Sequence, residues 1–421
     1  MSYITKQWYI INIGSVLLFL IGFFATWGEG MQHIFTKSSL IYPALIAIYL
    51  VYNFNTFKCT ISRHQIVPRE FKTLYVFITI HTVLYLILNF QSIGFGTEVG
   101  EVNDAGFVFG QTESGIIIVR YFLFLLFSLY LTVDLNKNNK LKIFSYAYIS
   151  GFIFTILGGA YNSYANGLMR FSGGLQDPNG MAFDAIVALL LSIYLHKINT
   201  SKKVRGFIIF SIAIDLFAVF LSFSRGAYLA LFIWFILCSI HIGLTRNVMR
   251  MIFVLILFAI IGTNVINKIG IDIETISTRF SIEEARKNKG ANRGYIWETY
   301  LTNADKYFLT GMGIGNSPKI MRNNKQGVSE NYESHNLYIQ FFAEFGFIGL
   351  FLYLRYWKKY IKEFRRTDGS EFILMSIGIC MMIVTFFLNI DKGRTFWIVL
   401  SILNMIWIRN RQQNIRRANC A

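Results

Sequence analysis

Apolar runs long enough to cross a membrane recur along almost the whole chain. Each spans roughly 18–20 residues, and about 20 apolar residues in a helix cross a bilayer core of about 30 Å. The 421-residue chain is 54% hydrophobic, an apolar share that soluble domains do not carry. We count twelve runs, at about residues 8–26, 38–54, 71–90, 115–133, 141–160, 180–197, 206–222, 226–243, 251–267, 336–354, 371–389 and 395–408. We therefore expect an all-α polytopic membrane protein of about 12 transmembrane helices, in which residues 1–421 form a single transmembrane domain.

The positions of the Lys and Arg residues predict how these helices are oriented. The chain has 40 Lys and Arg residues and a net charge of +17. If its first residues lie in the cytoplasm, the connections on that side hold most of these residues, as cytoplasmic loops of membrane proteins do. We therefore expect both termini in the cytoplasm. We do not expect the first run to be a cleaved signal peptide, because it is long and no small-residue cleavage site follows it.

One long polar insert interrupts the apolar pattern. It covers residues 268–335, between the ninth and tenth runs, and the charge bias places it outside the cytoplasm. Residues 290–309 have helical spacing, a glycine-rich turn follows at 311–315, and His335 closes the insert where the next span begins. Because the rest of the chain is apolar scaffold, we expect this partly helical loop to carry any chemistry.

Nothing in the sequence indicates a metal, a cofactor or nucleic acid. The four cysteines fall in predicted spans or cytoplasmic segments, so we expect no disulfide framework and no Cys/His metal cluster. The segment 311–315 superficially resembles a nucleotide-phosphate loop, but no strand precedes it, and a turn is the better interpretation.

Three arginines fall in three separate segments outside the predicted membrane: Arg170, Arg225 and Arg293. A guanidinium group binds phosphate oxygens in a bidentate manner and stays charged at physiological pH. A helix bundle that brought these side chains together would attract a diphosphate. The alternative is that each is a solvated charge or an interfacial anchor. Arg225 is harder to explain in that way, because it lies at the tip of a tight, otherwise apolar hairpin where a charge needs a partner.

His335 is the candidate general base. Its ordinary pKa near 6.5 lets an imidazole accept a proton from a sugar hydroxyl at neutral pH. The alternative is an interfacial histidine at the start of a span, and Asn336 is equally consistent with an N-cap. Asp177-Pro178-Asn179 forms a turn that can cap the next span.

The roles of two aromatic residues and of several ionisable residues within predicted spans stay open. Trp297 and Tyr300 share a helix face with Arg293, and either sugar stacking or packing on lipid explains them. Gly346 and Gly349 favour close helix packing. Four ionisable residues lie within predicted spans without an obvious relay, so we rank them below the outer cluster: His81, Asp184, Asp215 and Glu344.

The order of these motifs resembles that of the superfamily of O-antigen ligases and O-antigen or capsular polysaccharide polymerases. The resemblance is specific over about 222–350 and extends more loosely to the layout of spans. It rests on Ser222-Phe223-Ser224-Arg225-Gly226, Arg293 with Trp297, the 311–315 turn, His335-Asn336, Gly346-Phe347-Ile348-Gly349, and Arg170 with Asp177-Pro178-Asn179.

The resemblance implies a GT-C-like fold and an inverting, metal-independent glycosyl transfer on the outer face of the bacterial inner membrane. The donor is a glycan on undecaprenyl pyrophosphate. On the family pattern, Arg225 and Arg293 hold the pyrophosphate and His335 contacts or deprotonates the acceptor hydroxyl. The loop residues Arg170, Asp177 and Asn179 are then candidate substrate contacts, as are Trp297, Tyr300 and Asn336. The implied partners are the lipid-linked oligosaccharide, an acceptor glycolipid and membrane lipids, with a chain-length regulator as a further candidate.

Three functions stay open at this point. A polymerase passes the glycan to another lipid-linked repeat unit, whereas a ligase passes it to the lipid A core. The spacing from His335-Asn336 to Gly346 is typical of ligases, and the Asp177-Pro178-Asn179 loop is similar to that of polymerases; we favour polymerase. A polysaccharide transporter or flippase is the third alternative, but we identify neither the internal repeat nor the interrupted helix typical of transporters.

Overall fold

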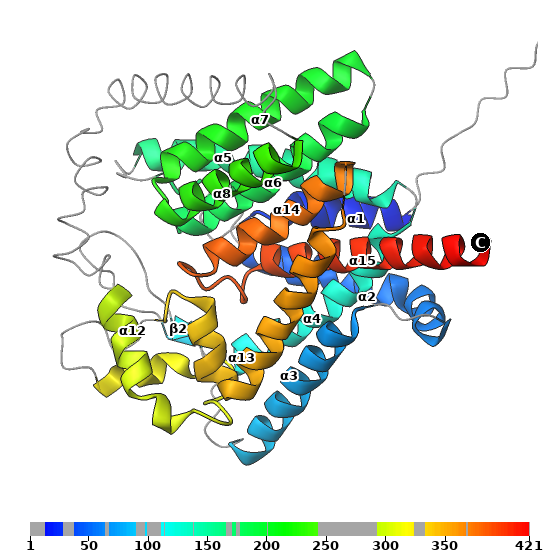
Figure 1. Ribbon diagram of the computed structural model, residues 1–421. Helices are drawn as coiled ribbons and strands as arrows, with labels where there is room; N and C mark the ends of the chain where they lie inside the picture. Colours follow the sequence, from blue (N-terminus) through cyan, green and yellow to red (C-terminus); the bar gives the residue numbers. More distant parts are fainter. Residues whose placement is uncertain are drawn as a thin grey trace, which may run out of the picture.

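The computed structural model describes most of the chain: residues 13–27, 38–63, 67–89, 97–98, 111–112, 114–137, 139–165, 171–173, 177–199, 201–242, 293–323, 333–367 and 369–420. These residues are almost entirely helical (Figure 1). The exception is one antiparallel pair of two-residue strands, β1 (Thr97–Glu98) and β2 (Gln111–Thr112). The all-α prediction is therefore confirmed for the described part of the chain.

Eleven of the twelve predicted runs coincide with helices in the described residues, and the run at 251–267 lies outside them. The helices are α1 (Ile13–Phe24), α2 (Ser38–Arg63), α3 (Arg69–Leu88), α4 (Ser114–Leu135), α5 (Lys140–Ala165), α6 (Pro178–Ile198), α7 (Lys202–Ser222), α8 (Arg225–Ile242), α13 (Leu337–Phe364), α14 (Gly369–Val384) and α15 (Arg394–Cys420). Six of those described are long and apolar enough to cross a membrane: α3, α4, α5, α6, α7 and α13. The chain is thus a multi-pass membrane protein, while the number twelve stays a prediction.

Helix α6 forms the centre of one side of the bundle. Nearly every side chain from Met181 to Leu195 is buried, because α5, α7, α8 and α14 surround this helix. Figure 1 shows these helices side by side, with α3 and α13 together on the opposite side of α14 and α15. Helices that are apolar on all faces gain stability only in such an interior or in lipid.

The N-termini of α8 and α13 lie at the same end of the bundle as the C-terminus of α14. The amide of Leu337 donates to the carbonyl of Thr385, 2.8 Å away, just after α14 ends. At the start of α8, a Cβ on Gly226 would lie 3.0 Å from the ring of Phe387. Since only Phe223 and Ser224 join α7 to α8, the predicted tight hairpin is confirmed, with Phe223 in the left-handed region at φ +49°.

The described part of the insert packs on the first turns of α13. It contains α12 (Arg293–Thr302) and two 3₁₀ helices, η3 (Ala304–Lys306) and η4 (Ser317–Asn323). These elements share a small apolar core with α13, formed by Ile296, Tyr300, Tyr307, Ile320, Met321 and Ala343. Half of the predicted loop at 268–335, namely residues 268–292 and 324–332, lies outside the described residues.

Helix α13 is interrupted at Gly346, contrary to the expectation that no span would be broken. Gly346 has φ +67° and ψ −170°, and a Cβ there would lie 2.2 Å from the carbonyl oxygen of Leu309. Only glycine adopts this backbone without strain. The interruption frees backbone groups on both sides, and the insert satisfies them.

The glycine-rich turn predicted at 311–315 is confirmed, and it docks on this interruption. The amides of Met312 and Gly313 donate to the carbonyls of Ala343 (2.8 Å) and Glu344 (3.0 Å). Gly311 lies so close to α13 that a Cβ would be 2.3 Å from the carbonyl oxygen of Glu344. Gly346 therefore joins the insert to the bundle, a different role from the helix–helix packing that we predicted.

Candidate functional site

Four of the predicted site residues lie at or just before the N-termini of four different helices. Asp177 precedes α6, Arg225 begins α8, Arg293 begins α12, and His335 lies two residues before α13. Helix N-termini carry partial positive charge and unsatisfied N–H groups, so a site built from them favours an anion.

The predicted cap on α6 is confirmed. The carboxylate of Asp177 accepts hydrogen bonds from the amides of Asn179 (2.9 Å) and Gly180 (3.2 Å). The side-chain amide of Asn179 also donates to this carboxylate, at 3.0 Å. These bonds fix the carboxylate of Asp177 at the end of α6.

Arg225 and Arg293 approach one another around the ring of Phe387. The guanidinium carbon of Arg293 lies 6.0 Å from the centroid of this ring, and Gly226 packs on the same ring. Burial lowers the pKa of Arg293, the charge of Arg225 lowers it further, and Asp177 opposes both effects. Within the described residues, neither guanidinium group makes a hydrogen bond or an ion pair. Two cations that lie close together and that the described residues do not pair directly form a site for an anionic ligand.

His335 belongs to the same group of charges. Burial lowers its pKa below the ordinary value and Arg293 lowers it further, while Glu333 and Asp177 act in the opposite direction. The imidazole is therefore neutral at physiological pH, the state in which it accepts a proton. Its backbone has φ +48°, a conformation that turns the chain from the insert into α13.

We call these four residues the cationic cluster: Asp177, Arg225, Arg293 and His335. The sequence predicted that Arg170, Arg225 and Arg293 would lie together near His335, and the structure brings Arg225, Arg293 and His335 together. Arg170 lies outside the described residues. The next residue, Phe171, donates its amide to the carbonyl of Leu221 at 3.3 Å, near the end of α7.

The other predicted contacts have mainly structural partners. The indole N–H of Trp297 donates to the carbonyl of Ser334 at 2.9 Å, which ties α12 to the residue before His335. Tyr300 has no exposed surface and packs in the core of the insert, so its ring offers no face to a sugar or to lipid. Asn336 is the N-cap of α13 and accepts hydrogen bonds from the amides of Tyr338 (3.0 Å) and Ile339 (3.2 Å).

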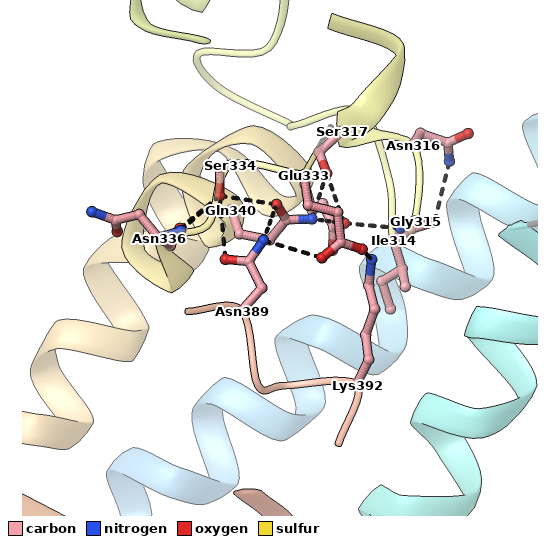
Figure 2. A network of polar contacts seen from close by, with 11 residues as sticks. Ile314, Gly315, Asn316, Ser317, Glu333, Ser334, Asn336, Gln340, Asn389 and Lys392 are labelled. Atoms are coloured by element: carbon pink, nitrogen blue, oxygen red, sulfur yellow. Dashed lines mark hydrogen bonds and ion pairs between the residues drawn. The ribbon is translucent and has the colours of Figure 1, made fainter. Parts of the chain in front are cut away.

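A second polar group lies beside the cluster, and the sequence did not reveal it (Figure 2). Glu333 forms an ion pair with Lys392 and accepts a hydrogen bond from the side chain of Asn389 at 3.2 Å. The hydroxyl of Ser334 donates to the carbonyl of Asn336 at 2.8 Å. The segment that carries His335 is thus held against the connection between α14 and α15.

The same network continues into α13. The side-chain amide of Gln340 donates to the Ser317 hydroxyl and to the Glu344 carboxylate. Glu344 also accepts from the amide of Gly315 at 3.0 Å and from Ser317 at 3.1 Å. We call this group the Glu333 network; it comprises Gly315, Ser317, Glu333, Ser334, Gln340, Glu344, Asn389 and Lys392. It fixes a buried carboxylate of α13 to the insert.

The charges in this network compensate one another. Burial alone would raise the pKa of Glu333, but Lys392 and the bonds that Glu333 accepts lower it below the ordinary value. Burial alone would lower the pKa of Lys392, but Glu333, Glu344 and Asp391 raise it. Both partners are therefore charged over the physiological pH range.

The fold and this site define a class of protein: a multi-pass helical membrane protein with a basic site at one end of its bundle. A family model described as O-antigen ligase matches residues 210–354, from within α7 to within α13. The match supports, for these residues, the resemblance to the superfamily of O-antigen ligases and polymerases that the sequence motifs predicted. A comparison with curated proteins gives no match.

The matched residues include three members of the cationic cluster, Arg225, Arg293 and His335. Asp177 lies before the matched region. The family thus indicates a membrane glycosyltransferase of the ligase or polymerase type, which acts on a lipid-linked oligosaccharide and a glycolipid.

Proposed function

We propose that this protein is a surface-polysaccharide polymerase that transfers a glycan from undecaprenyl pyrophosphate to a lipid-linked repeat unit. The observation that supports it is the cationic cluster, in which two guanidinium groups without an ion-pair partner in the described residues lie beside a neutral imidazole. In this proposal the cluster faces the periplasm, the protein lies in the bacterial inner membrane, and both termini lie in the cytoplasm.

The two arginines hold the donor diphosphate. Each guanidinium presents a rigid fork of donors that matches phosphate oxygens, and partial burial strengthens these charge-assisted bonds. The mutual repulsion between Arg225 and Arg293 also favours an anion between them. Because both groups are already in place, they stabilise the charge that grows on the leaving diphosphate without reorganising.

His335 receives the proton from the acceptor. As the acceptor hydroxyl oxygen forms its bond to the anomeric carbon, its proton moves to the imidazole. The bond between that carbon and the diphosphate oxygen breaks, and the electron pair leaves with the diphosphate. A single displacement of this kind inverts the anomeric configuration, through an oxocarbenium-like transition state. The guanidinium groups supply the charge compensation, so the step uses no metal ion.

The remaining predicted contacts hold these groups in place. Trp297 and Asn336 fix the backbone on either side of His335 through Ser334 and the first turn of α13. Asp177 supplies a negative charge opposite Arg293 and His335, and Asn179 holds its carboxylate. A shift of about 1 Å in such a base is enough to lose a large part of the rate.

A ligase is the second candidate, because the matching family model is described as O-antigen ligase. Both enzymes use the same donor and the same cluster, and they differ in the acceptor. The test is to incubate purified protein with a lipid-diphosphate repeat unit, alone and together with lipid A core. Growth of the lipid-linked chain supports the polymerase, and glycan on lipid A core supports the ligase. If the folded wild-type protein forms neither product, both the polymerase and the ligase proposals are refuted.

A further inference from the structure

A cavity of about 480 Å³ lies beside the cationic cluster, among the ends of α1, α2, α4, α6 and α15. Three basic residues line it: Arg120 on α4, Lys392 on the connection after α14, and Arg394 at the start of α15. The cavity shares Asp177 with the cationic cluster, and it shares Asn389 and Lys392 with the Glu333 network. A ligand in it would therefore adjoin the segment that carries His335.

Arg120 has an unusual position for a charged residue. It is the seventh residue of α4, about 9 Å along the helix axis at 1.5 Å per residue. Its side chain is exposed, and in the described part of the chain it makes no hydrogen bond or ion pair. A charge on a membrane-spanning helix is costly unless it meets water or an opposite charge. An anion in the cavity provides that opposite charge.

The other two cations are already fixed by the protein. Arg394 donates to the carbonyl of Phe24 at 3.1 Å and to that of Trp27, and its guanidinium carbon lies 4.4 Å from the centroid of the Tyr42 ring. Lys392 pairs with Glu333. Glu333 offsets the charge of Lys392, whereas the guanidinium of Arg120 is available for direct contact with a ligand.

The lining of the cavity combines basic side chains with apolar surface. The lining also holds two acidic residues, Asp177 and Asp184. Because Glu333 already compensates Lys392, the guanidinium groups of Arg120 and Arg394 supply the positive charge of the lining. Apolar side chains complete the wall: Val119, Leu123, Phe124, Phe183 and Phe396. A phosphate group attached to a lipid matches both parts of this lining.

We propose that this cavity binds the phosphate group of the acceptor glycolipid, with Arg120 as its main direct contact. The inference rests on the proposed function and adds to it a second anion site, separate from the arginines that hold the donor. The shared chemistry is a phosphate on a membrane lipid. Its source is either the diphosphate of a lipid-linked repeat unit or a phosphate of lipid A core.

Counting bound ligands tests this without knowledge of the sugar. The full-length protein in detergent is titrated with a short-chain prenyl diphosphate, and the bound molecules are counted by native mass spectrometry. We expect two per chain for the wild type, one for Arg120→Gln, one for Arg293→Gln, and none for the double variant. A prenol without the diphosphate should bind neither to the wild type nor to any of these variants. Arg355→Gln, which removes an exposed arginine of α13, is the matched control and should still bind two.

The affinity of the Arg120-dependent site gives a second measure. Loss of one charge-assisted contact should weaken binding there about tenfold or more. Arg120→Lys, which keeps the charge without the fork, should weaken it less. Competition by phosphorylated lipid A core, but not by its dephosphorylated form, would assign the site to that acceptor. Lack of such competition would assign it to the lipid-linked repeat unit.

The outcomes separate the two proposals. A single bound diphosphate in the wild type that survives Arg120→Gln and is lost in Arg293→Gln would overturn the second site and leave the proposed function intact. No bound diphosphate in the wild type would overturn both. The wild-type count decides whether a second site exists, and two molecules bound to Arg120→Gln would overturn its placement in this cavity. If Arg120→Gln does not fold, the weaker binding expected of Arg120→Lys tests the same contact.

Discussion

The cationic cluster and the Glu333 network are neighbours in this protein, but they differ in how their charges are compensated. In the network, Glu333 pairs with Lys392, and Glu344 accepts bonds from Gly315, Ser317 and Gln340. In the cluster, Arg225 and Arg293 raise each other's electrostatic energy, and the described residues offer neither of them an ion pair. Folding alone gains nothing from holding two such cations together, since Arg293 is half-buried and the charge of the exposed Arg225 repels it.

The difference assigns separate tasks to the two regions. The paired charges hold the insert, α13 and the connection after α14 in one arrangement, and they leave little binding capacity for a ligand. The guanidinium groups of the cationic cluster, which the described residues do not pair, retain their capacity to bind a ligand. A change in the network should therefore reduce stability, and a change in the cluster should reduce transfer while the fold persists.

The largest effect is expected in the cluster. Arg293→Gln should lower the rate of glycan transfer by about 10²–10³-fold, the range measured when one preorganised donor to a developing anion is removed. Its melting temperature should stay near that of the wild type, because no ion pair is lost. The measurement is single-turnover transfer with purified protein, alongside thermal unfolding in the same detergent.

Arg355→Gln serves as the control for this experiment, since Arg355 is an exposed arginine on a span, far along α13 from the site. It should transfer at the wild-type rate. Equal rates in Arg293→Gln and the control would show that the cluster takes no part in the reaction.

The next largest effect is expected where the network meets the interrupted helix. Gly346→Ala places a Cβ 2.2 Å from the carbonyl oxygen of Leu309 at a residue with φ +67°. Backbone strain and the displaced insert should together lower the free energy of unfolding by about 2–4 kcal/mol. Denaturant unfolding measures this loss.

Gly206→Ala is the matched control on a membrane-spanning helix, because a Cβ there meets nothing within 4 Å. Alanine in a helix interior is favoured over glycine by about 1 kcal/mol, so this variant should be neutral or slightly stabilised. A Gly346→Ala variant as stable as Gly206→Ala would mean that the insert does not depend on the interruption.

A smaller loss is expected for the ion pair. Lys392→Met leaves the carboxylate of Glu333 without its cation, and partial exposure of both groups limits the cost to about 1–3 kcal/mol. Adding Glu333→Gln should restore part of the stability, because the uncompensated charge is then removed. Unfolding of the two single variants and the double variant measures the coupling. If the losses of unfolding free energy in the two single variants add up to the loss in the double variant, the two side chains do not interact.

Local sequence patterns predicted the helices and their caps, whereas long-range pairs stayed hidden. The runs of apolar residues and the capping side chains of Asp177 and Asn336 each act within a few residues, so they can be recognised in the sequence. Glu333 and Lys392 lie 59 residues apart, and only the packing of α13 against the end of α14 brings them together. Gly346 was recognised as small, but nothing local showed that the carbonyl of Leu309 would approach it.

The candidate site could be predicted in part for a related reason. Arg225, Arg293 and His335 are unusual residues for their surroundings, so the sequence alone draws attention to them. Tyr300 shares a helix face with Arg293 and yet is fully buried, because the core that covers it comes from η4 and α13. A helical pattern shows which residues share a face and not what covers that face.

The smallest predicted effect tests whether Asp177 belongs to the cluster electrostatically or only caps α6. Its charge raises the pKa of His335, against the lowering by burial and by Arg293. Asp177→Asn removes the charge and keeps the cap, since asparagine is as good an N-cap as aspartate. The imidazole should then stay neutral to lower pH, and the acid limb of the rate should move to lower pH, because the charge that raised the pKa of His335 is gone. Profiles of kcat/KM against pH measure the shift. A limb that moved upward, or a loss of stability without a shift, would leave Asp177 as a cap alone and restrict the cluster to its three basic residues.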